Sequence, residues 1–448
     1  MTDSGNNGAS SRDRSTFGVV FLTIFLDMVG FSVIFPLFPG MLDHYLKVEE
    51  LRGGGMLNDF VNSIRGSGYS SDNTSFRIET VIFGGCLGTL FAVLQFLFAP
   101  LWGRWSDRVG RRRVLLISVS GTVLGYFIWI FAGNFWILVL SRLVGGIASG
   151  NLSVATAAIA DVTPRKERAK GMAIVGIAFG LGFILGPAIG GFSPALDLAG
   201  DMSEASFFGL NPFSVPAIGS FGLASLNLLW LFLRFKETLP KEKREKNATI
   251  RPGIFQLGKV ENSAVKLSCL SYLFYMISFS GMEFTLTFLA VERFEYTPRD
   301  NALMFTFIGL TLIVAQGFFV RRLAGPLGER KLAFFGIFMG IIAFYLIAKS
   351  SSGDAGADFF VGLLLMSAGV AFISPTLTAL TSLYSSESSQ GFHLGVFRSS
   401  GSLARAVGPL LAGFVYFEFG SSVAYLGGAC LLFIPALILV WVPQPSTD

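Results

Sequence analysis

Residues 103–113 read Gly-Arg-Trp-Ser-Asp-Arg-Val-Gly-Arg-Arg-Arg and connect two apolar segments, 78–101 and 114–131. Each segment is close to the roughly 20 residues that an α-helix needs to cross a bilayer. A short basic turn between two such segments is typical of helices that cross the membrane and return. The same pattern recurs along the chain, so we expect an all-α membrane protein.

The composition favours the same fold class. Of the 448 residues, 52% are hydrophobic and 14% are charged, whereas a soluble globular protein carries about 25% charged residues. This composition excludes an ordinary water-soluble enzyme and a disordered protein. The two His and three Cys residues offer no catalytic or metal-binding arrangement. We therefore expect no enzyme activity, no metal and no cofactor.

Twelve apolar runs of about 18 residues or more are bounded by charged or turn residues. Six precede and six follow a charged linker, which predicts two six-helix bundles related by a pseudo-twofold axis. The expected parts are an N-terminal tail at 1–16, a first bundle at 17–233, a linker at 234–263, a second bundle at 264–442 and a C-terminal tail at 443–448. The expected spans are 17–41, 78–101, 114–131, 135–162, 172–191, 213–233, 265–291, 302–320, 332–348, 359–384, 394–417 and 422–441.

The distribution of Lys and Arg predicts the orientation, because connections rich in these residues stay in the cytoplasm. Of the 34 Lys and Arg residues, 25 lie in the N-terminal tail and the even-numbered connections, counting Lys266 and Arg398 at their edges, 7 lie in the odd-numbered connections and 2 lie within spans. Both termini are therefore expected in the cytoplasm, in a plasma or inner membrane. The bias also explains the net charge of +5, which indicates no nucleic-acid partner. The long polar connection at 41–77, with the glycosylation pattern at 73–75, is expected outside.

The two halves of the chain repeat each other. A second basic stretch at 317–331 follows the eighth span, and Gly186-Pro187 in the fifth span matches Gly408-Pro409 in the eleventh. Parallel six-span repeats enclose a substrate site between the halves, near the middle of the bilayer. Transport is therefore the leading hypothesis.

Three groups of residues carry a resemblance to a known family. The first resembles the signature loop of the major facilitator superfamily, the second the fifth-helix motif of its antiporters, and the third the first two helices of its twelve-span drug/proton antiporters. The residues that match the signature loop are Gly103, Asp107, Arg108, Gly110, Arg111 and Arg112. Those that match the fifth-helix motif are Gly182, Gly186, Pro187, Gly190 and Gly191, and Ala173 replaces a more distant Gly of that motif. Those that match the first two helices are Asp27, Gly30, Pro36 and Pro39, together with residues 95–100.

Residues 83–96, 279–286 and 403–409 are similar to the tetracycline-transporter-like members of animals, which are implicated in organic-anion efflux. Bacterial tetracycline/proton antiporters are similar too, notably at 159–161. They have an acidic residue where Gly125 stands here and another in the ninth span, where this chain has none. This departure disfavours tetracycline itself as the substrate. The resemblance implies the twelve-helix fold of the superfamily and proton-coupled antiport of lipophilic small molecules or organic anions.

Four ionisable side chains lie well inside the expected spans, where a charge costs about 3 kcal/mol unless it faces a cavity or a partner. Asp27 lies about 15 Å into its helix, and Glu283 lies in the outer half of the seventh span. Arg142 matches an Arg in the fourth helix of the superfamily, a residue that is often assigned to proton transfer. Arg405 lies one turn before Pro409. We expect these four residues to serve proton coupling. A fixed structural pair for Asp27, and a structural tether or an anion site at Arg405, remain open.

Two gates follow from these residues. Our hypothesis is that Arg142 and Glu283 pair to close the outer side. On the cytoplasmic side, Gly103 and Gly110 permit a tight approach and a turn, and Asp107 can accept hydrogen bonds from a neighbouring helix N-terminus. The resemblance implies that Arg111 pairs with Asp161 there and that the signature loop, including Arg108 and Arg112, gates this side. Simple retention of basic residues in the cytoplasm is the alternative.

The expected substrate cavity contains Phe31, Phe35, Gln95, Asn151 and Phe284. The glycines of the fifth span leave one helix face bare for close packing, and a bend at Gly186-Pro187 that prevents proton leak is the functional alternative. The expected partners are a small organic solute, protons and the lipid bilayer, and we expect a monomer. A proton symporter or facilitator, and a non-transporting receptor or scaffold, remain alternatives.

Overall fold

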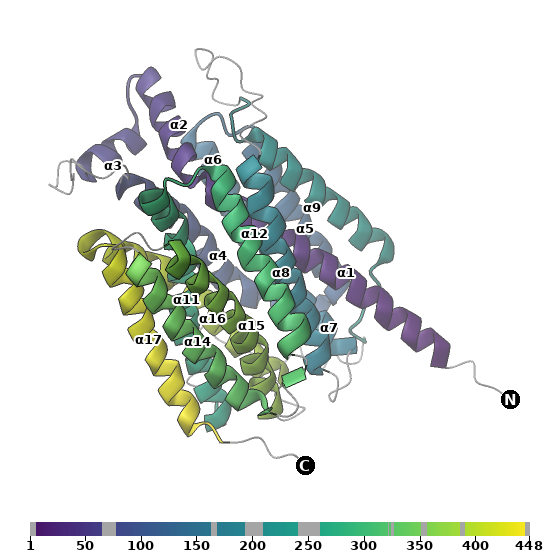
Figure 1. Cartoon of the computed structure of the whole chain (residues 1–448). Helices are drawn as coiled ribbons and strands as arrows, with labels where there is room; N and C mark the ends of the chain where they lie inside the picture. Colours follow the sequence, from purple (N-terminus) through teal and green to yellow (C-terminus); the bar gives the residue numbers. More distant parts are fainter. Residues whose placement is uncertain are drawn as a thin grey trace.

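The computed structural model describes residues 6–64, 78–162, 168–192, 209–240, 260–320, 322–323, 327–350, 356–385 and 390–443. Within these residues every regular element is a helix, as expected (Figure 1). The first half comprises α1 (Asn6–Ser32), η1 (Phe35–Leu37), α2 (Phe38–Leu51), α3 (Met56–Ile64), α4 (Ile78–Val109), α5 (Arg111–Ile130), α6 (Phe135–Ala148), α7 (Asn151–Val162), α8 (Arg168–Phe192) and α9 (Ser214–Arg234). The second half comprises α11 (Ser263–Phe294), α12 (Pro298–Val314), η7 (Ala315–Val320), α14 (Glu329–Ser350), α15 (Gly356–Leu383), α16 (Gln390–Phe419) and α17 (Ser421–Trp441).

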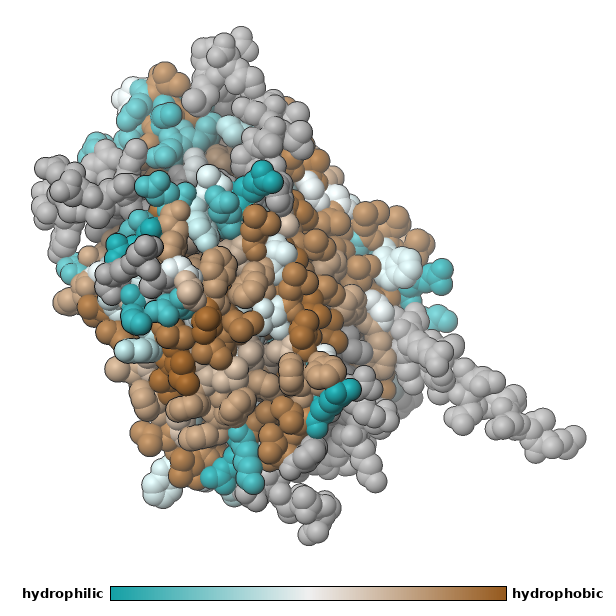
Figure 2. Space-filling view, viewed as in Figure 1, coloured by the Kyte–Doolittle hydropathy of each residue, from teal (hydrophilic) through white to brown (hydrophobic). Residues whose placement is uncertain are grey.

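The twelve expected spans each correspond to helical structure in the described part of the chain. Nine helical stretches there are long and apolar enough to cross a membrane, and two shorter apolar ones lie in α1 and α8. Helix α16 accounts for the remaining span. Hydrophobic residues cover the middle of the face shown in Figure 2, and hydrophilic residues gather near its two ends. This belt is the surface that a bilayer would surround.

The start of α1 and the end of α17 lie at the same end of the molecule, opposite α2 and α3 (Figure 1). We name the two ends after the elements found there: the α2–α3 end, and the α4–α5 end, where α4 turns into α5. Within the expected polar connection at 41–77, the structure adds two helices that the sequence did not predict: α2 extends to Leu51, and α3 follows it. Glu49 accepts a hydrogen bond from the Asn58 backbone N–H (2.9 Å) and thereby fixes α3 on α2. The pattern at 73–75 lies outside the described residues.

Two of the expected spans are interrupted. The first ends as a regular helix at Ser32, and the chain then forms a 3₁₀ turn that contains Pro36, because Pro lacks the N–H that an α-helix requires. The fourth breaks between α6 and α7, at Ser149 and Gly150. A Cβ on Gly150 would lie 2.1 Å from the Trp102 side chain, so the indole occupies the space beside this break.

The sequence repeat is also a repeat of atomic contacts. Ser32 Oγ on α1 lies 3.1 Å from the Gly182 carbonyl oxygen on α8, and Ser280 Oγ on α11 lies 3.2 Å from the Ala404 carbonyl oxygen on α16. In each half the contacted carbonyl lies one turn before the matching Gly-Pro pair. Hence Ser32 and Ser280 are equivalent positions, and α1–α8 and α11–α16 are equivalent helix pairs.

Glycines on α8 bring it against α1 and the other half. A Cβ at Gly182 would lie 2.4 Å from Met28 Cβ, and one at Gly190 would lie 2.1 Å from the Val33 carbonyl oxygen. On another face, a Cβ at Gly180 would lie 2.4 Å from Leu312 of α12. Helices α8 and α12 therefore pack directly, as do α4 and α16. These contacts join the two halves.

We expect Gly186→Ala to destabilise the protein. The new Cβ would lie 2.0 Å from Ser32 Oγ and 2.6 Å from the Val29 carbonyl oxygen, and a backbone atom cannot move away cheaply. Overpacking of this kind costs about 1–3 kcal/mol. The control is Gly222→Ala on α9, where a Cβ would meet no atom within 4 Å. The measurement is the midpoint of thermal unfolding in detergent; a midpoint for Gly186→Ala at or above that of Gly222→Ala would contradict the packing argument.

Candidate functional site

A cavity lies between α1, α4, α5 and α6 of the first half and α11 and α16 of the second. It has about 1090 Å³ of empty space, counting the part open to solvent. Its wall combines charged and polar groups with aromatic rings. The lining includes Asp27, Gln95, Tyr126, Arg142, Glu283 and Arg405, together with Phe31, Phe38, Phe91 and Phe284. All four ionisable residues singled out from the sequence therefore face one cavity.

Asp27 is held by the fourth span. Asn151 Nδ2 donates a hydrogen bond to Asp27 Oδ1 at 2.7 Å. Asn151 is the first residue of α7 and is buried, so the break between α6 and α7 directs this amide at the carboxylate. Asn151 was expected to line the cavity; the structure shows that it contacts the cavity through Asp27.

Arg142 on α6 lies in an aromatic environment. Its Cζ lies 4.5 Å from the centroid of the Trp129 ring, and Nη2 donates to Ser141 Oγ at 3.3 Å. The hydroxyl groups of Tyr45 and Tyr126 interact electrostatically with the guanidinium. Its Nε is buried without a hydrogen-bond partner. The guanidinium is thus stabilised by the Trp129 ring, and its Nε retains a donor that a ligand could use.

Glu283 on α11 lies in the part of the cavity bordered by α16. The charged group that acts on it is Arg405, whose Cζ lies 5.7 Å from the centroid of the Phe31 ring across the interface between the halves. Glu283 Oε1 is buried without a hydrogen-bond partner. The structure does not bring Arg142 and Glu283 into an ion pair, contrary to our hypothesis for the outer gate, because each side chain has a different environment.

The repeat gives the relative depth of the two acids. Asp27 precedes Ser32 by more than one turn, whereas Glu283 follows the equivalent Ser280 by almost one turn. At 1.5 Å per residue the two positions differ by about 12 Å along the helix axes. Asp27 therefore lies towards the α4–α5 end of the cavity, and Glu283 lies towards the α2–α3 end.

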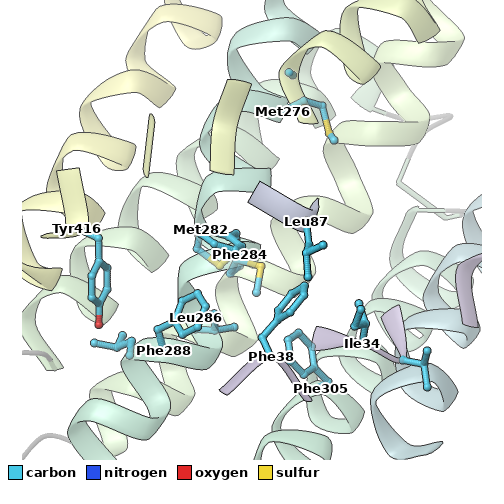
Figure 3. Close-up of a cluster of buried hydrophobic side chains, with 14 of the residues drawn as sticks. Ile34, Phe38, Leu87, Met276, Met282, Phe284, Leu286, Phe288, Phe305 and Tyr416 are labelled. Carbon is cyan, nitrogen blue, oxygen red and sulfur yellow. The ribbon is translucent and has the colours of Figure 1, made fainter. Parts of the chain in front are cut away.

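Apolar side chains close the cavity at the α2–α3 end. Phe38, Leu87, Phe284 and Phe305 point towards one another from both halves, with Ile34 and Phe288 beside them (Figure 3). We call these six residues the apolar plug, and each of them is less than a tenth exposed. The Phe284 ring fits against Gly85, where a Cβ would lie 3.2 Å from Cζ. Hydrophobic packing, in place of the expected ion pair, thus closes this end.

The signature loop forms a polar network at the α4–α5 end. Gly110 makes the turn with φ = 110°, a conformation that favours glycine. Arg111 is buried; its Nε lies 3.0 Å from Asp161 Oδ2, and its Nη1 lies 2.6 Å from Asp107 Oδ1. The pair of Arg111 with Asp161 that the resemblance implied is present. Asp107 contacts Arg111, and not the helix N-terminus that we expected.

Other expectations for this loop and cavity have mixed outcomes. A Cβ at Gly103 would meet nothing closer than Ser153 Oγ at 3.8 Å, so the expected tight approach there is wrong. Arg112 donates to the Phe232 carbonyl oxygen at 2.7 Å, and Arg108 is exposed. The Phe35 side chain lies outside the described part of the structure.

Sequence reasoning missed Glu237 and Thr238, which we had assigned only to the linker. Glu237 Oε1 and Oε2 accept hydrogen bonds from the backbone N–H groups of Arg111 (2.9 Å) and Arg112 (3.3 Å). Thr238 Oγ1 donates to Asp161 Oδ2 at 3.3 Å. The start of the linker therefore caps α5. The order of residues gave no signal for this contact, since it joins segments more than 100 residues apart.

Known proteins resemble this chain along nearly its whole length. The sequence profile of the Major Facilitator Superfamily matches residues 20–385 and 317–448. The chain belongs to the major facilitator superfamily. It is 34% identical to the human major facilitator superfamily domain-containing protein 10 across 97% of this chain and 94% of that protein. It is 31% identical to the class E tetracycline resistance protein of Escherichia coli across 96% of each chain.

Solved structures of major facilitator proteins agree in fold. The crystal structure of the human organic anion transporter MFSD10 (TETRAN) matches with a TM-score of 0.78 and 32% identity, over 95% of this chain and 99% of that one. The E. coli xylose transporter XylE in a partially occluded inward-open conformation matches with a TM-score of 0.68 and 16% identity, over 98% and 99%. The predicted fold and family are thus confirmed, and the chain is a multi-pass membrane transporter of small molecules.

Gly30 tests whether the arrangement around Asp27 matters for transport. A Cβ at Gly30 would lie 1.6 Å from Tyr126 Oη, so Gly30→Ala must displace the Tyr126 ring, on which both Asp27 and Arg142 act electrostatically. Misplacing groups of a working site costs about tenfold or more, and we expect transport in proteoliposomes to fall by that factor. Gly88→Ala is the matched control, because Gly88 also lines the cavity but a Cβ there would meet nothing within 4 Å. Equal transport by the two variants would count against a role for the Tyr126 position.

Proposed function

We propose that this transporter exports lipophilic organic anions in exchange for protons by alternating access. The observation that carries the proposal is the single cavity lined by Asp27 and Glu283, from different halves and at different depths, together with Arg142 and Arg405. Ionisable groups inside a membrane protein are costly and mark ion or substrate pathways. A non-transporting receptor has no need of four such groups around one cavity.

Protons would reach the two acids from opposite sides. An ionised carboxylate in a low-dielectric interior is costly, and protonation removes that cost. Glu283 lies towards the α2–α3 end, and its Oε1 has no protein partner, so it would take up a proton when that end opens. Asp27 lies towards the α4–α5 end, where its proton would be released. The excess of Lys and Arg in the connections at the α4–α5 end supports a cytoplasmic location for that end.

The cavity wall fits an aromatic or lipophilic anion. Arg142 and Arg405 supply positive charge, and Phe31, Phe91 and Phe284 supply aromatic surface. A guanidinium binds a carboxylate through two parallel hydrogen bonds, while the rings would bury the apolar body of the substrate. The description of the human relative as an organic anion transporter supports this substrate class.

A switch between two conformations would couple the export of the substrate to the entry of protons. The apolar plug separates the cavity from the α2–α3 end, so opening that end requires Phe38 and Leu87 to part from Phe284 and Phe305. At the other end, the contacts of Arg111 with Asp107 and Asp161 would stabilise one of the two states. Substrate and protons would then shift the equilibrium by binding the states differently.

A flux experiment in liposomes tests the exchange. Purified protein is reconstituted with a pH gradient of either sign, and uptake of anionic, cationic and neutral lipophilic compounds is measured. We expect uptake of the anions alone, driven by a proton gradient in the opposite direction. In Asp27→Asn and Glu283→Gln, flux should no longer follow the gradient, because a neutral side chain cannot exchange a proton.

Asp358→Asn is the control for the loss of a carboxylate, because Asp358 lies outside the cavity and pairs with Lys349 at 3.0 Å. It should transport like the wild type. Flux that runs in the same direction as the protons would indicate symport, and gradient-independent flux in the wild type would indicate a facilitator. Gradient-driven flux that survives in both cavity variants would overturn the assignment of the two acids.

A further inference from the structure

Helix α16 carries a second arginine on the cavity-facing side. Arg398 precedes Arg405 by about two helical turns, which places the two residues on one face and about 10 Å apart along the axis. Arg398 is half-buried, and within the described residues no acidic side chain pairs with it. The groups that act on it electrostatically are the Tyr272 hydroxyl on α11 and Arg405 itself. Two like charges on one face repel each other unless an anion lies near them.

The stretch of α11 near Arg398 carries two tyrosines, of which Tyr272 acts on Arg398 electrostatically. The Tyr272 ring stacks on Phe397 with centroids 4.0 Å apart and an interplanar angle of 17°. Gly401 makes room for this ring, because a Cβ there would lie 2.6 Å from Tyr272 Cε1. Tyr272 is therefore held firmly beside the Arg398 turn of α16, and in the described structure its hydroxyl makes no hydrogen bond.

Tyr275 lies about one turn further along α11, towards Glu283. Its ring centroid is 6.3 Å from that of Tyr272. The side chain is 3% exposed, and its hydroxyl is buried without a hydrogen-bond partner. It interacts electrostatically with Tyr272, Glu283 and Arg405. A buried hydroxyl without a partner is costly, and an acceptor bound beside it would remove that cost.

We propose that Arg398, Tyr272 and Tyr275 form a second anion-binding site, between the cavity and the α4–α5 end of the protein. The ligand is a carboxylate on an aromatic or aliphatic body, held by the guanidinium and by the two phenol hydroxyls as donors. From this site the carboxylate passes to Arg405, two turns deeper. The inference rests on the proposed anion transport and adds a loading site to it.

An arginine that marks only the membrane interface has a different environment. Such residues extend to the headgroups and need no partner inside the bundle. Arg234, at the end of α9, fits that description: its Cζ lies 5.6 Å from the Trp230 ring, and both side chains are exposed. Arg398 differs because the groups that act on it are the buried Tyr272 on α11 and a second arginine, Arg405. Arg398 and Arg234 therefore form a matched pair for experiment.

The test uses the full-length protein in proteoliposomes and benzoate as the probe, with neutral benzamide as its isostere. Loss of a charge-assisted contact lowers affinity by about tenfold or more. We therefore expect Arg398→Gln to raise KM for benzoate by about that factor with little change in kcat, and Arg398→Lys to restore part of the loss. Arg234→Gln should leave both values unchanged.

The Tyr275→Phe variant distinguishes a loss of ligand binding from a loss of stability. Because it removes a buried hydroxyl that has no partner, the midpoint of thermal unfolding should stay the same or rise, while KM for benzoate should increase severalfold. Benzoate transport that depends on Arg405 but is equal in Arg398→Gln and Arg234→Gln would overturn this site and leave the proposed function intact. A wild-type protein that neither binds nor transports benzoate or other organic anions would overturn both.

Discussion

The cost of charge in a low-dielectric interior is the constraint on which this structure depends. Asp27, Arg142, Glu283 and Arg405 all lie deep in the helix bundle, and all four face one cavity. Each has its own form of stabilisation: an amide donor for Asp27, a tryptophan ring for Arg142, an opposite charge nearby for Glu283 and the Phe31 ring for Arg405. In the part of the chain that the structure describes, Asp27, Arg142 and Glu283 form no ion pair, so a proton or an anion can change the local balance. On a water-exposed surface, solvent and salt would screen such groups, and a change in their charge would matter less.

Close helix packing makes this cavity possible. Ser32 against Gly182 and Gly186, and Ser280 against Ala404 and Gly408, are the same contact built twice. The contact holds α1 on α8 and α11 on α16, and so fixes the helices that carry the ionisable residues. The scaffold is symmetric, but the charges are not: the position of α11 equivalent to Asp27 is Tyr275, and Glu283 lies more than two turns further along. A symmetric frame with asymmetric charges has two different ends, as the proposed exchange of substrate for protons requires.

Different contacts hold the two ends of the molecule together. At the α2–α3 end, the apolar plug excludes water by packing aromatic rings from both halves, with Gly85 leaving space for Phe284. At the α4–α5 end, Arg111 links Asp107 and Asp161, and Glu237 holds the α5 N-terminus. Packed apolar surfaces separate with little directional preference, whereas a hydrogen-bonded network must exchange specific partners. The start of the predicted linker takes part in that network, because Glu237 and Thr238 bond to the first half of the chain.

The sequence by itself determined the helical membrane fold, the repeat, the family and the ionisable residues of the cavity. Hydrophobic length, Gly-Pro positions and buried charge are local properties, and each can be seen in a short stretch of chain. The pair of Arg111 with Asp161 came from the family resemblance. Only the tertiary structure decided which partners the charges have. In the folded chain, Asp27 accepts a hydrogen bond from Asn151, and Arg142 lies against the Trp129 ring. An apolar plug is present instead of the expected pair of Arg142 and Glu283, and Arg398 lies near Tyr272. Those contacts depend on how the helices pack and rotate against one another, because side chains far apart in the sequence meet only after the glycine faces have fixed that packing.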